Sequence, residues 1–115
     1  MFHKLSTIIY HVNDLPNAKA WYTQLTGIKP YFDEAYYVGF SINGCELGLD
    51  PDETKIQYGN NAIAYWKVDN IHQAVEKAES IGAALVSPVE QVGGTIEVAV
   101  IKDPFGNSIG LITGV

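Results

Sequence analysis

Two stretches of the chain share one pattern, in which an apolar, strand-like segment runs into an amphipathic helix. They span residues 7–28 and residues 63–83. A helix that packs one face against the rest of a protein repeats its apolar residues every three or four positions. Both stretches do so with the same spacing, displaced by 56 positions: Leu15, Ala18, Tyr22 and Leu25 in the first, and Ile71, Ala74, Ala78 and Ile81 in the second. The chain therefore contains an internal repeat of a strand followed by a helix.

Both predicted helices are bordered by residues that favour a helix start or a helix end. Asp14 and Asn70 precede the two apolar stripes, and their side-chain oxygens can accept hydrogen bonds from the free amides of a first helical turn. Pro16 suits that first turn as well. Gly27 and Gly82 follow the stripes, where glycine commonly ends a helix. We expect the two helices to lie between these residues.

Short β-rich segments follow each helix and are separated by turn residues. A repeat of this length indicates two similar modules, each too small to bury its own sheet face, that pair into one domain. The predicted fold class is α+β, with two βαβββ modules at residues 1–58 and 59–115 of a single domain. The predicted later strands lie at 36–42, 45–49, 95–101 and 108–113, with further strands before Pro30 and near Leu85, and turns at 43–44 and 103–107.

Alternation along the predicted strands separates two faces of each strand. One face is apolar and is expected to contact the helices; it includes Tyr10, Val38, Phe40, Leu47, Val98 and Leu111. The other face mixes charges, hydroxyl groups, glycines and apolar groups; it includes His11, Tyr37, Glu46, Tyr65, Lys67 and Glu97. Such a mixture suits a concave surface for a ligand. A plain solvent-exposed sheet face is the alternative.

Composition and charge exclude several classes of protein. The chain has 115 residues with seven basic and thirteen acidic side chains, a net charge of −6, and no cluster of lysine or arginine. A nucleic acid or an anionic membrane surface is therefore not expected as a partner. We found no apolar run near the roughly 18 residues of a membrane span and no signal-peptide pattern, so a cytoplasmic protein is expected. Cys45 is the one cysteine and cannot form an internal disulfide or build a zinc site by itself.

Six side chains on the mixed face can bind or orient a small ligand. Tyr37 and Tyr65 can stack on a planar group or donate a phenolic hydrogen bond. The imidazole of His11 can bind an anion or act as a general base. Glu46 and Glu97 can supply an acidic lining, with Lys67 as the counter-charge. Glu97 is the most unusual of them, since it interrupts a strongly apolar predicted strand.

Three sequence motifs, together with the repeat, resemble the vicinal oxygen chelate superfamily, which groups glyoxalase I, bleomycin-resistance proteins and extradiol dioxygenases. The motifs are Val-Asn-Asp-Leu followed by Ala-x-x-Trp-Tyr-x-x-Leu-x-Gly at 12–27, Glu-Leu-Gly-Leu at 46–49, and Asp-Pro-Phe-Gly-Asn-x-x-Gly-Leu at 103–111. The resemblance covers essentially the whole chain. It implies paired βαβββ modules whose curved mixed sheet surrounds a cleft, and commonly a homodimer. Pairing of the modules within one chain or across a dimer stays open.

The same resemblance places the metal ligands of such proteins at four positions of this chain. Catalytic divalent metals need about three protein ligands from His, Cys, Asp or Glu. By position, the first-strand ligands fall at Thr7 and Ile63, and the late-strand ligands fall at Gly48 and Gly110. We therefore predict no glyoxalase-type or dioxygenase-type metal and no cofactor. A shift of two positions would instead bring Glu46 or Ser108 into a ligand position.

These observations predict a metal-free, small-molecule binding protein of the glyoxalase/bleomycin-resistance type. The ligand would be a small organic molecule in the cleft between the modules, held by His11, Tyr37, Glu46, Tyr65, Lys67 and Glu97. The first alternative is a lyase or isomerase-like enzyme acting on a small carbonyl compound, with a metal at displaced positions or with His11 and Glu97 as acid and base. The second alternative is a scaffold for protein interaction.

Overall fold

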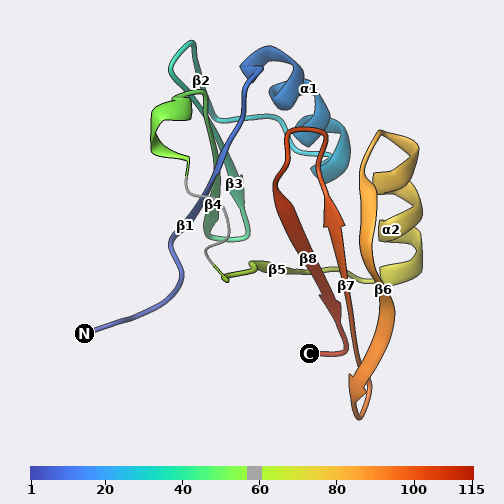
Figure 1. Cartoon of the computed structure of the whole chain (residues 1–115). Coiled ribbons are helices and arrows are strands. Elements are labelled where there is room, and N and C mark those ends of the chain that lie inside the picture. The colour runs from blue at the N-terminus through green and yellow to red at the C-terminus, as the bar shows by residue number, and fades with distance from the viewer. Residues whose placement is uncertain (57–60) are drawn as a thin grey trace. The chain divides into compact units, whose positions relative to one another are not determined.

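The computed structural model describes residues 1–56 and 61–115 of the chain (Figure 1). The chain forms two compact units, residues 1–58 and residues 59–115, called here the N-terminal and C-terminal units. Within the described residues each unit has one α-helix and one four-stranded mixed sheet. The predicted α+β class with two βαβββ modules is confirmed. Neither α-helix in this part of the chain has the length and apolar character needed to cross a membrane.

The N-terminal unit has the strand order β1-β4-β3-β2, with β1 parallel to β4 and the other neighbours antiparallel. Asp14 caps α1 by accepting a hydrogen bond from the backbone N–H of Asn17 at 3.1 Å, and Gly27 ends it with a φ of 71°. The sequence predicts both of these residues as the start and the end of the helix. The elements are β1 (Thr7–His11), α1 (Leu15–Thr26), β2 (Phe32–Glu34), β3 (Tyr37–Ile42), β4 (Cys45–Asp50) and the 3-10 turn η1 (Glu53–Lys55).

Helix α1 covers one face of this sheet and contacts β3 and β4. The strand residues that the sequence assigns to the helix-facing side are buried there, as are the apolar residues of α1 that meet them. Phe40, Leu49, Ala18 and Tyr22 are all 0% exposed. Tyr22 packs edge-on against Trp21 and stacks with Tyr10 of β1. Because polar residues or glycines alternate with larger apolar residues in β3 and β4, the sequence predicts both faces of these strands correctly.

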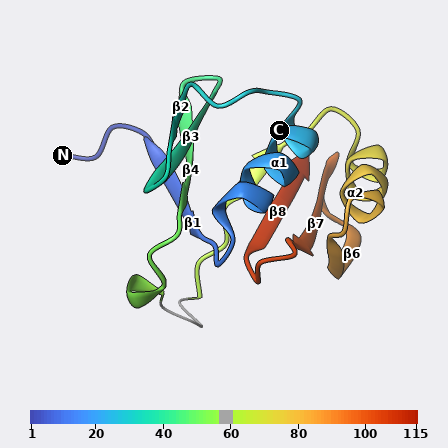
Figure 2. The same ribbon diagram turned by 90° about the horizontal axis from the view of Figure 1, so that it is seen from above.

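The C-terminal unit has the strand order β5-β8-β7-β6. Figure 2 shows α2 alongside β6 and β7, and α2 contacts β6, β7 and β8. The strand expected near Leu85 is β6, whereas the one expected before Pro30 is wrong in position, because β2 begins after the proline at Phe32. The elements are β5 (Tyr65–Lys67), α2 (Ile71–Ser80), β6 (Ala84–Gly93), β7 (Ile96–Lys102) and β8 (Ser108–Thr113).

The pairing of β7 with β8 corrects the faces predicted for β7. Glu97 lies opposite Thr113, Ala99 opposite Leu111, and Ile101 opposite Ile109. Paired residues project to the same side of a sheet. Thr113 and Leu111 share one side of β8, so Glu97 lies on the side of Leu111. The sequence correctly predicts that Leu111 faces the helix. The prediction that Val98 faces the helix and Glu97 faces away is therefore wrong. The physical reason is that β7 is apolar on both sides, so alternation alone cannot distinguish its faces.

Candidate functional site

The face of the N-terminal sheet that points away from α1 carries the candidate site, and we call it the open face. Its residues follow from the register of the four strands. Gly48 lies at its centre, opposite Ile9 of β1 on one side and opposite Gly39 of β3 on the other. Thr7 and Ser41 flank Glu46 in the same way. The open face comprises Thr7, Ile9, His11, Phe32, Glu34, Tyr37, Gly39, Ser41, Glu46, Gly48 and Asp50.

A carboxylate held by two tyrosines is the most specific polar feature of the open face. The Tyr31 hydroxyl donates a hydrogen bond to Oε1 of Glu46, and the Tyr37 hydroxyl donates one to Oε2. The hydrogen bond to Glu46 raises the pKa of Tyr31. Burial, followed by the bond to Glu46, raises the pKa of Tyr37. Both phenols therefore stay protonated at neutral pH and act as donors to the carboxylate.

The tyrosine rings lie directly over the glycines of the open face. A Cβ atom at Gly48 would lie 2.6 Å from Cζ of Tyr37 and closer still to its hydroxyl oxygen. A Cβ at Gly39 would lie 3.2 Å from Cε1 of Tyr31. Such separations are too short for a carbon side chain at Gly48, so only glycine lets the Tyr37 ring reach Glu46 from β3.

Four aromatic side chains gather at the β2–β3 end of the open face. The ring centroid of Phe32 lies 6.5 Å from that of Tyr31, 6.0 Å from that of Tyr36 and 6.1 Å from that of Tyr37. Tyr31 and Tyr36 are 63% and 68% exposed, which is unusual for rings of this size. This aromatic cluster borders the carboxylate of Glu46 on the side of β2.

Of the six predicted site residues, three lie together on the open face: His11, Tyr37 and Glu46. His11 ends β1 opposite Asp50, and its Nδ1 lies 3.1 Å from the backbone oxygen of Asp52. Tyr31 belongs to the same site, but the sequence does not indicate it. It precedes a strand of only three residues, and its backbone N–H extends the pairing by donating to the oxygen of Gly39 at 3.0 Å. A strand that short produces no recognisable alternation.

Tyr65 and Lys67 lie on β5 of the C-terminal unit and share one face of that sheet. Tyr65 pairs with Gly110, and its ring covers that glycine: a Cβ at Gly110 would lie 2.6 Å from Cδ1 of Tyr65. The Tyr65 ring therefore covers Gly110, as the Tyr37 ring covers Gly48. Lys67 is exposed and lies opposite Ile112 of β8.

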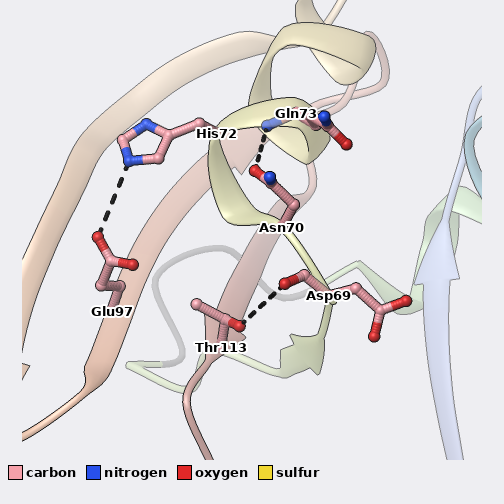
Figure 3. A network of polar contacts seen from close by, with 6 residues as sticks. All are labelled: Asp69, Asn70, His72, Gln73, Glu97 and Thr113. Carbon is pink, nitrogen blue, oxygen red and sulfur yellow. Dashed lines mark hydrogen bonds and ion pairs between the residues drawn. The ribbon is translucent and has the colours of Figure 1, made fainter.

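Glu97, the sixth predicted residue, belongs to a different set of contacts at the start of α2 (Figure 3). Its Oε2 lies 3.8 Å from Nε2 of His72, on the first turn of α2. On the same turn Asn70 accepts a hydrogen bond from the backbone N–H of Gln73 at 3.0 Å. The Thr113 hydroxyl donates to the backbone oxygen of Asp69 at 3.5 Å. These polar contacts connect β7 and β8 to the start of α2, and Glu97 takes part through its ion pair with His72.

The residues present do not fit a glyoxalase-type metal. At the two late-strand ligand positions, Gly48 and Gly110, tyrosine rings occupy the space in which a ligand side chain would begin. Glu46 lies opposite Thr7, but its two carboxylate oxygens already accept bonds from phenols. In residues 1–56 and 61–115, no three side chains among His, Cys, Asp and Glu come together to hold a metal ion.

Two units, each with one helix on a four-stranded sheet in the order βαβββ, define the paired-βαβββ class of proteins. A model of the Glyoxalase/Bleomycin resistance protein/Dioxygenase superfamily matches residues 4–111. The chain belongs to this superfamily. The resemblance drawn from the motifs is therefore confirmed.

Solved structures with the same fold support this assignment. A glyoxalase/bleomycin resistance protein/dioxygenase family enzyme from Burkholderia phytofirmans PsJN has a TM-score of 0.82 at 17% identity, covering 98% of this chain and 100% of that one. A glyoxalase/bleomycin resistance protein from Albidiferax ferrireducens T118 gives 0.77 at 21%, covering 95% and 98%. A lactoylglutathione lyase from Agrobacterium tumefaciens gives 0.75 at 19%, covering 96% and 93%. At these identities the likeness extends to the fold alone. No match was found among curated proteins.

Proposed function

We propose that this protein is a metal-free binder of a small organic molecule, which it holds on the open face of its N-terminal sheet. Tyr31, Tyr37 and Glu46 would form the polar centre of the site, with His11 at its edge. The observation that carries the proposal is the Tyr37 ring over Gly48, because it fills a ligand position of the metal-dependent relatives and uses its hydroxyl to hold Glu46 instead.

Tyr65 over Gly110 supports the same interpretation independently. The C-terminal unit fills the corresponding position with a tyrosine from a different strand, and its Tyr65 remains 46% exposed. Tyr65 and Lys67 share the face of the C-terminal sheet that points away from α2, and they are retained as ligand-binding candidates there. Glu97 is left out, since its carboxylate lies beside His72 on the α2 side of the sheet.

The contacts favour binding over the alternative, a lyase or isomerase-like activity on a small carbonyl compound. That alternative needs a displaced metal or a free acid and base. Glu46, the carboxylate nearest a ligand position, is already bonded to two protonated phenols. Acid–base catalysis by this carboxylate would first require these hydrogen bonds to break.

Metal analysis and a ligand screen together test the proposal. We expect protein purified without chelator to contain far less than one equivalent of zinc, nickel, iron or manganese. A fragment library followed by protein NMR should return ligands whose affinity falls in Tyr37→Ala. Glu79→Gln, a change on the exposed face of α2, serves as the control and should bind them unchanged. Stoichiometric metal, or ligands that ignore both Tyr37→Ala and His11→Ala, would contradict the proposal. Homodimer formation remains a prediction, which sedimentation velocity measures.

A further inference from the structure

We propose, as a deepening of the function above and resting on it, that the open face recognises a protonated amine carried on an aromatic or apolar body. Three properties of the face support this choice: its charge, its exposed rings and the direction of its hydrogen bonds. Each excludes a different kind of competing ligand.

The charge of the open face is negative. The strands β1 to β4, all within the described residues, contain no lysine or arginine, whereas Glu34, Glu46 and Asp50 lie on the open face. Lys19 projects to the opposite side, where it pairs with Asp33 of β2. A ligand on this face thus meets three carboxylates and the imidazole of His11. Coulomb repulsion disfavours an anionic ligand there.

The other lysines of the N-terminal unit whose side chains are described do not change the charge of this face. Lys4 precedes β1, and its ammonium donates to the backbone oxygen of Gly44 at 3.0 Å, in the β3–β4 turn. Lys29 lies in the segment between α1 and β2 and is exposed. Asp50 uses one oxygen to accept the backbone N–H of Asp52 at 2.8 Å, which leaves its charge in place.

The exposed aromatic rings suit the rest of such a ligand. Tyr31 and Tyr36 are more than half exposed, and both are in ring contact with Phe32. Aromatic faces attract cations and also stack on planar apolar groups. A ligand with a charged amine and an aromatic body can therefore use Glu46 and the aromatic cluster together.

The direction of the hydrogen bonds separates an amine from a carbonyl or carboxylate ligand. Tyr31 and Tyr37 both donate their only hydroxyl protons to Glu46, so their oxygens are left to act as acceptors. The ionised carboxylate is an acceptor only, with about four lone-pair sites, of which the phenols use two. The two phenols and the carboxylate thus offer only acceptors, and a ligand group that itself only accepts hydrogen bonds finds no partner among these three. An ammonium group supplies up to three donors and a positive charge.

Three probes of one shape test this inference on the intact chain. Benzylammonium, benzyl alcohol and benzoate share a ring and differ in charge and donors. We expect NMR titration at neutral pH and low salt to place benzylammonium on the open face, with an affinity at least about tenfold higher than that of the other two, as for a charge-assisted bond. Added salt should weaken benzylammonium selectively.

Variants identify the group responsible. Glu46→Gln should weaken benzylammonium about tenfold and leave benzyl alcohol unchanged, while Glu79→Gln should change neither. Glu34→Gln provides a second variant should Glu46→Gln unfold. It removes another carboxylate of the open face, so it should weaken benzylammonium at low salt and leave benzyl alcohol unchanged.

The outcomes distinguish this inference from the function on which it rests. If benzoate or benzyl alcohol binds the open face as tightly as benzylammonium, or if neither Glu46→Gln nor Glu34→Gln weakens benzylammonium, the inference is overturned and small-molecule binding stands. If neither these probes nor a fragment library perturbs the resonances of open-face residues, the proposed function fails as well.

Discussion

The ring of Tyr37 lies over Gly48, and its hydroxyl oxygen occupies the space that a side chain at position 48 would need. The C-terminal unit repeats this relationship with Tyr65 and Gly110, although Tyr65 comes from the first strand of its unit and Tyr37 from the third. Two different strands thus supply a tyrosine to the same place in the repeat. In both units a tyrosine ring therefore fills the space that a side chain at position 48 or 110 would occupy.

Gly48→Ala should destabilise the N-terminal unit, because the new methyl group must displace Tyr37 from Glu46. We expect a loss of about 1–3 kcal/mol in the free energy of unfolding, measured by urea denaturation. Gly93→Ala is the control, since nothing lies within 4 Å of a Cβ there, and it should change stability by less than about 0.5 kcal/mol. Adding Tyr37→Ala to Gly48→Ala should cost less than the sum of the two changes. Additive losses would contradict the close approach.

Gly110→Ala should behave differently from Gly48→Ala in the double variant. A Cβ at Gly110 meets not only the Tyr65 ring but also the backbone oxygen of Ala64, at 2.8 Å. Truncating Tyr65 to alanine removes only the first of these contacts. We therefore expect Tyr65→Ala to relieve a smaller share of the Gly110→Ala loss than Tyr37→Ala relieves at Gly48. If the tyrosine truncations restored equal shares of the lost stability at both sites, the Ala64 backbone would have to move away from the new methyl group.

The N-terminal unit could be predicted from the sequence more completely than the C-terminal one. In β3 and β4 polar residues or glycines alternate with larger apolar ones, so the sequence distinguishes the open face with Glu46 from the buried face with Phe40. In β7 the residues between Glu97 and Lys102 are apolar on both faces of the strand. The side on which Glu97 lies depends on its pairing with Thr113, which is a long-range property of the sheet. Alternation is local and cannot contain that information.

The sequence predicts some residues of the candidate site, but it does not predict the hydrogen bonds that join them. Tyr37 and Glu46 could be recognised because they occupy regular positions of well-formed strands. Tyr31 could not be, since it lies just before the three residues of β2. The bond from Tyr31 to Glu46 joins residues 15 positions apart in the sequence. The bond therefore depends on how β2 pairs with β3 and how β3 pairs with β4.

Glu97→Gln should leave ligand binding unchanged, contrary to the role that the sequence suggests. The substitution removes only the ion pair with His72, whose side chain is 69% exposed. Exposed ion pairs contribute about 0–1 kcal/mol, so stability should fall by no more than that. Affinities for screened ligands, measured by NMR titration, should match those of the parent chain. A loss comparable to that of Glu46→Gln would return Glu97 to the ligand site.

Tyrosine titration should reveal the bonds to Glu46. An ordinary tyrosine has a pKa near 10, and the pKa values of Tyr31 and Tyr37 are both raised. Ultraviolet absorbance of tyrosinate should therefore show Tyr31 and Tyr37 ionising above the ordinary range while the protein remains folded, with Tyr31→Phe and Tyr37→Phe identifying their signals. Glu46→Gln should lower the pKa of both, because it removes the negative charge and a strong acceptor.

The same raised pKa values predict how stability depends on pH. Unfolding releases the two phenols to their ordinary pKa near 10, so between that pH and their folded pKa the native state holds more protons than the unfolded state. Their contribution to the free energy of unfolding is complete below about pH 10 and is lost as the pH rises further. Urea denaturation at a series of alkaline pH values should show this fall. The fall should be smaller in Glu46→Gln, and an equal fall would contradict the assignment.

Asp103 should be the costliest single truncation in the β7–β8 turn. It is only 4% exposed, and its carboxylate accepts the backbone N–H groups of Phe105 at 2.9 Å and Asn107 at 2.7 Å and the side-chain amide of Asn107 at 3.0 Å. Asp103→Ala leaves these donors without their acceptor, so we expect a loss of about 3 kcal/mol in urea denaturation. Asp103→Asn keeps Oδ1 as an acceptor for both backbone groups and should lose about half as much.

The matched control for Asp103→Ala is Asp33→Ala. Asp33 also has a side-chain partner, Lys19, but this ion pair lies at the surface. The side chain of Asp33 is 45% exposed and that of Lys19 is 41% exposed. Water replaces the lost contact there, so removing Asp33 should cost less than about 1 kcal/mol. If both alanine variants lost the same stability, the loss at Asp103 would reflect charge removal in general. A difference of the predicted size would instead assign it to the buried acceptor, which holds the turn between β7 and β8.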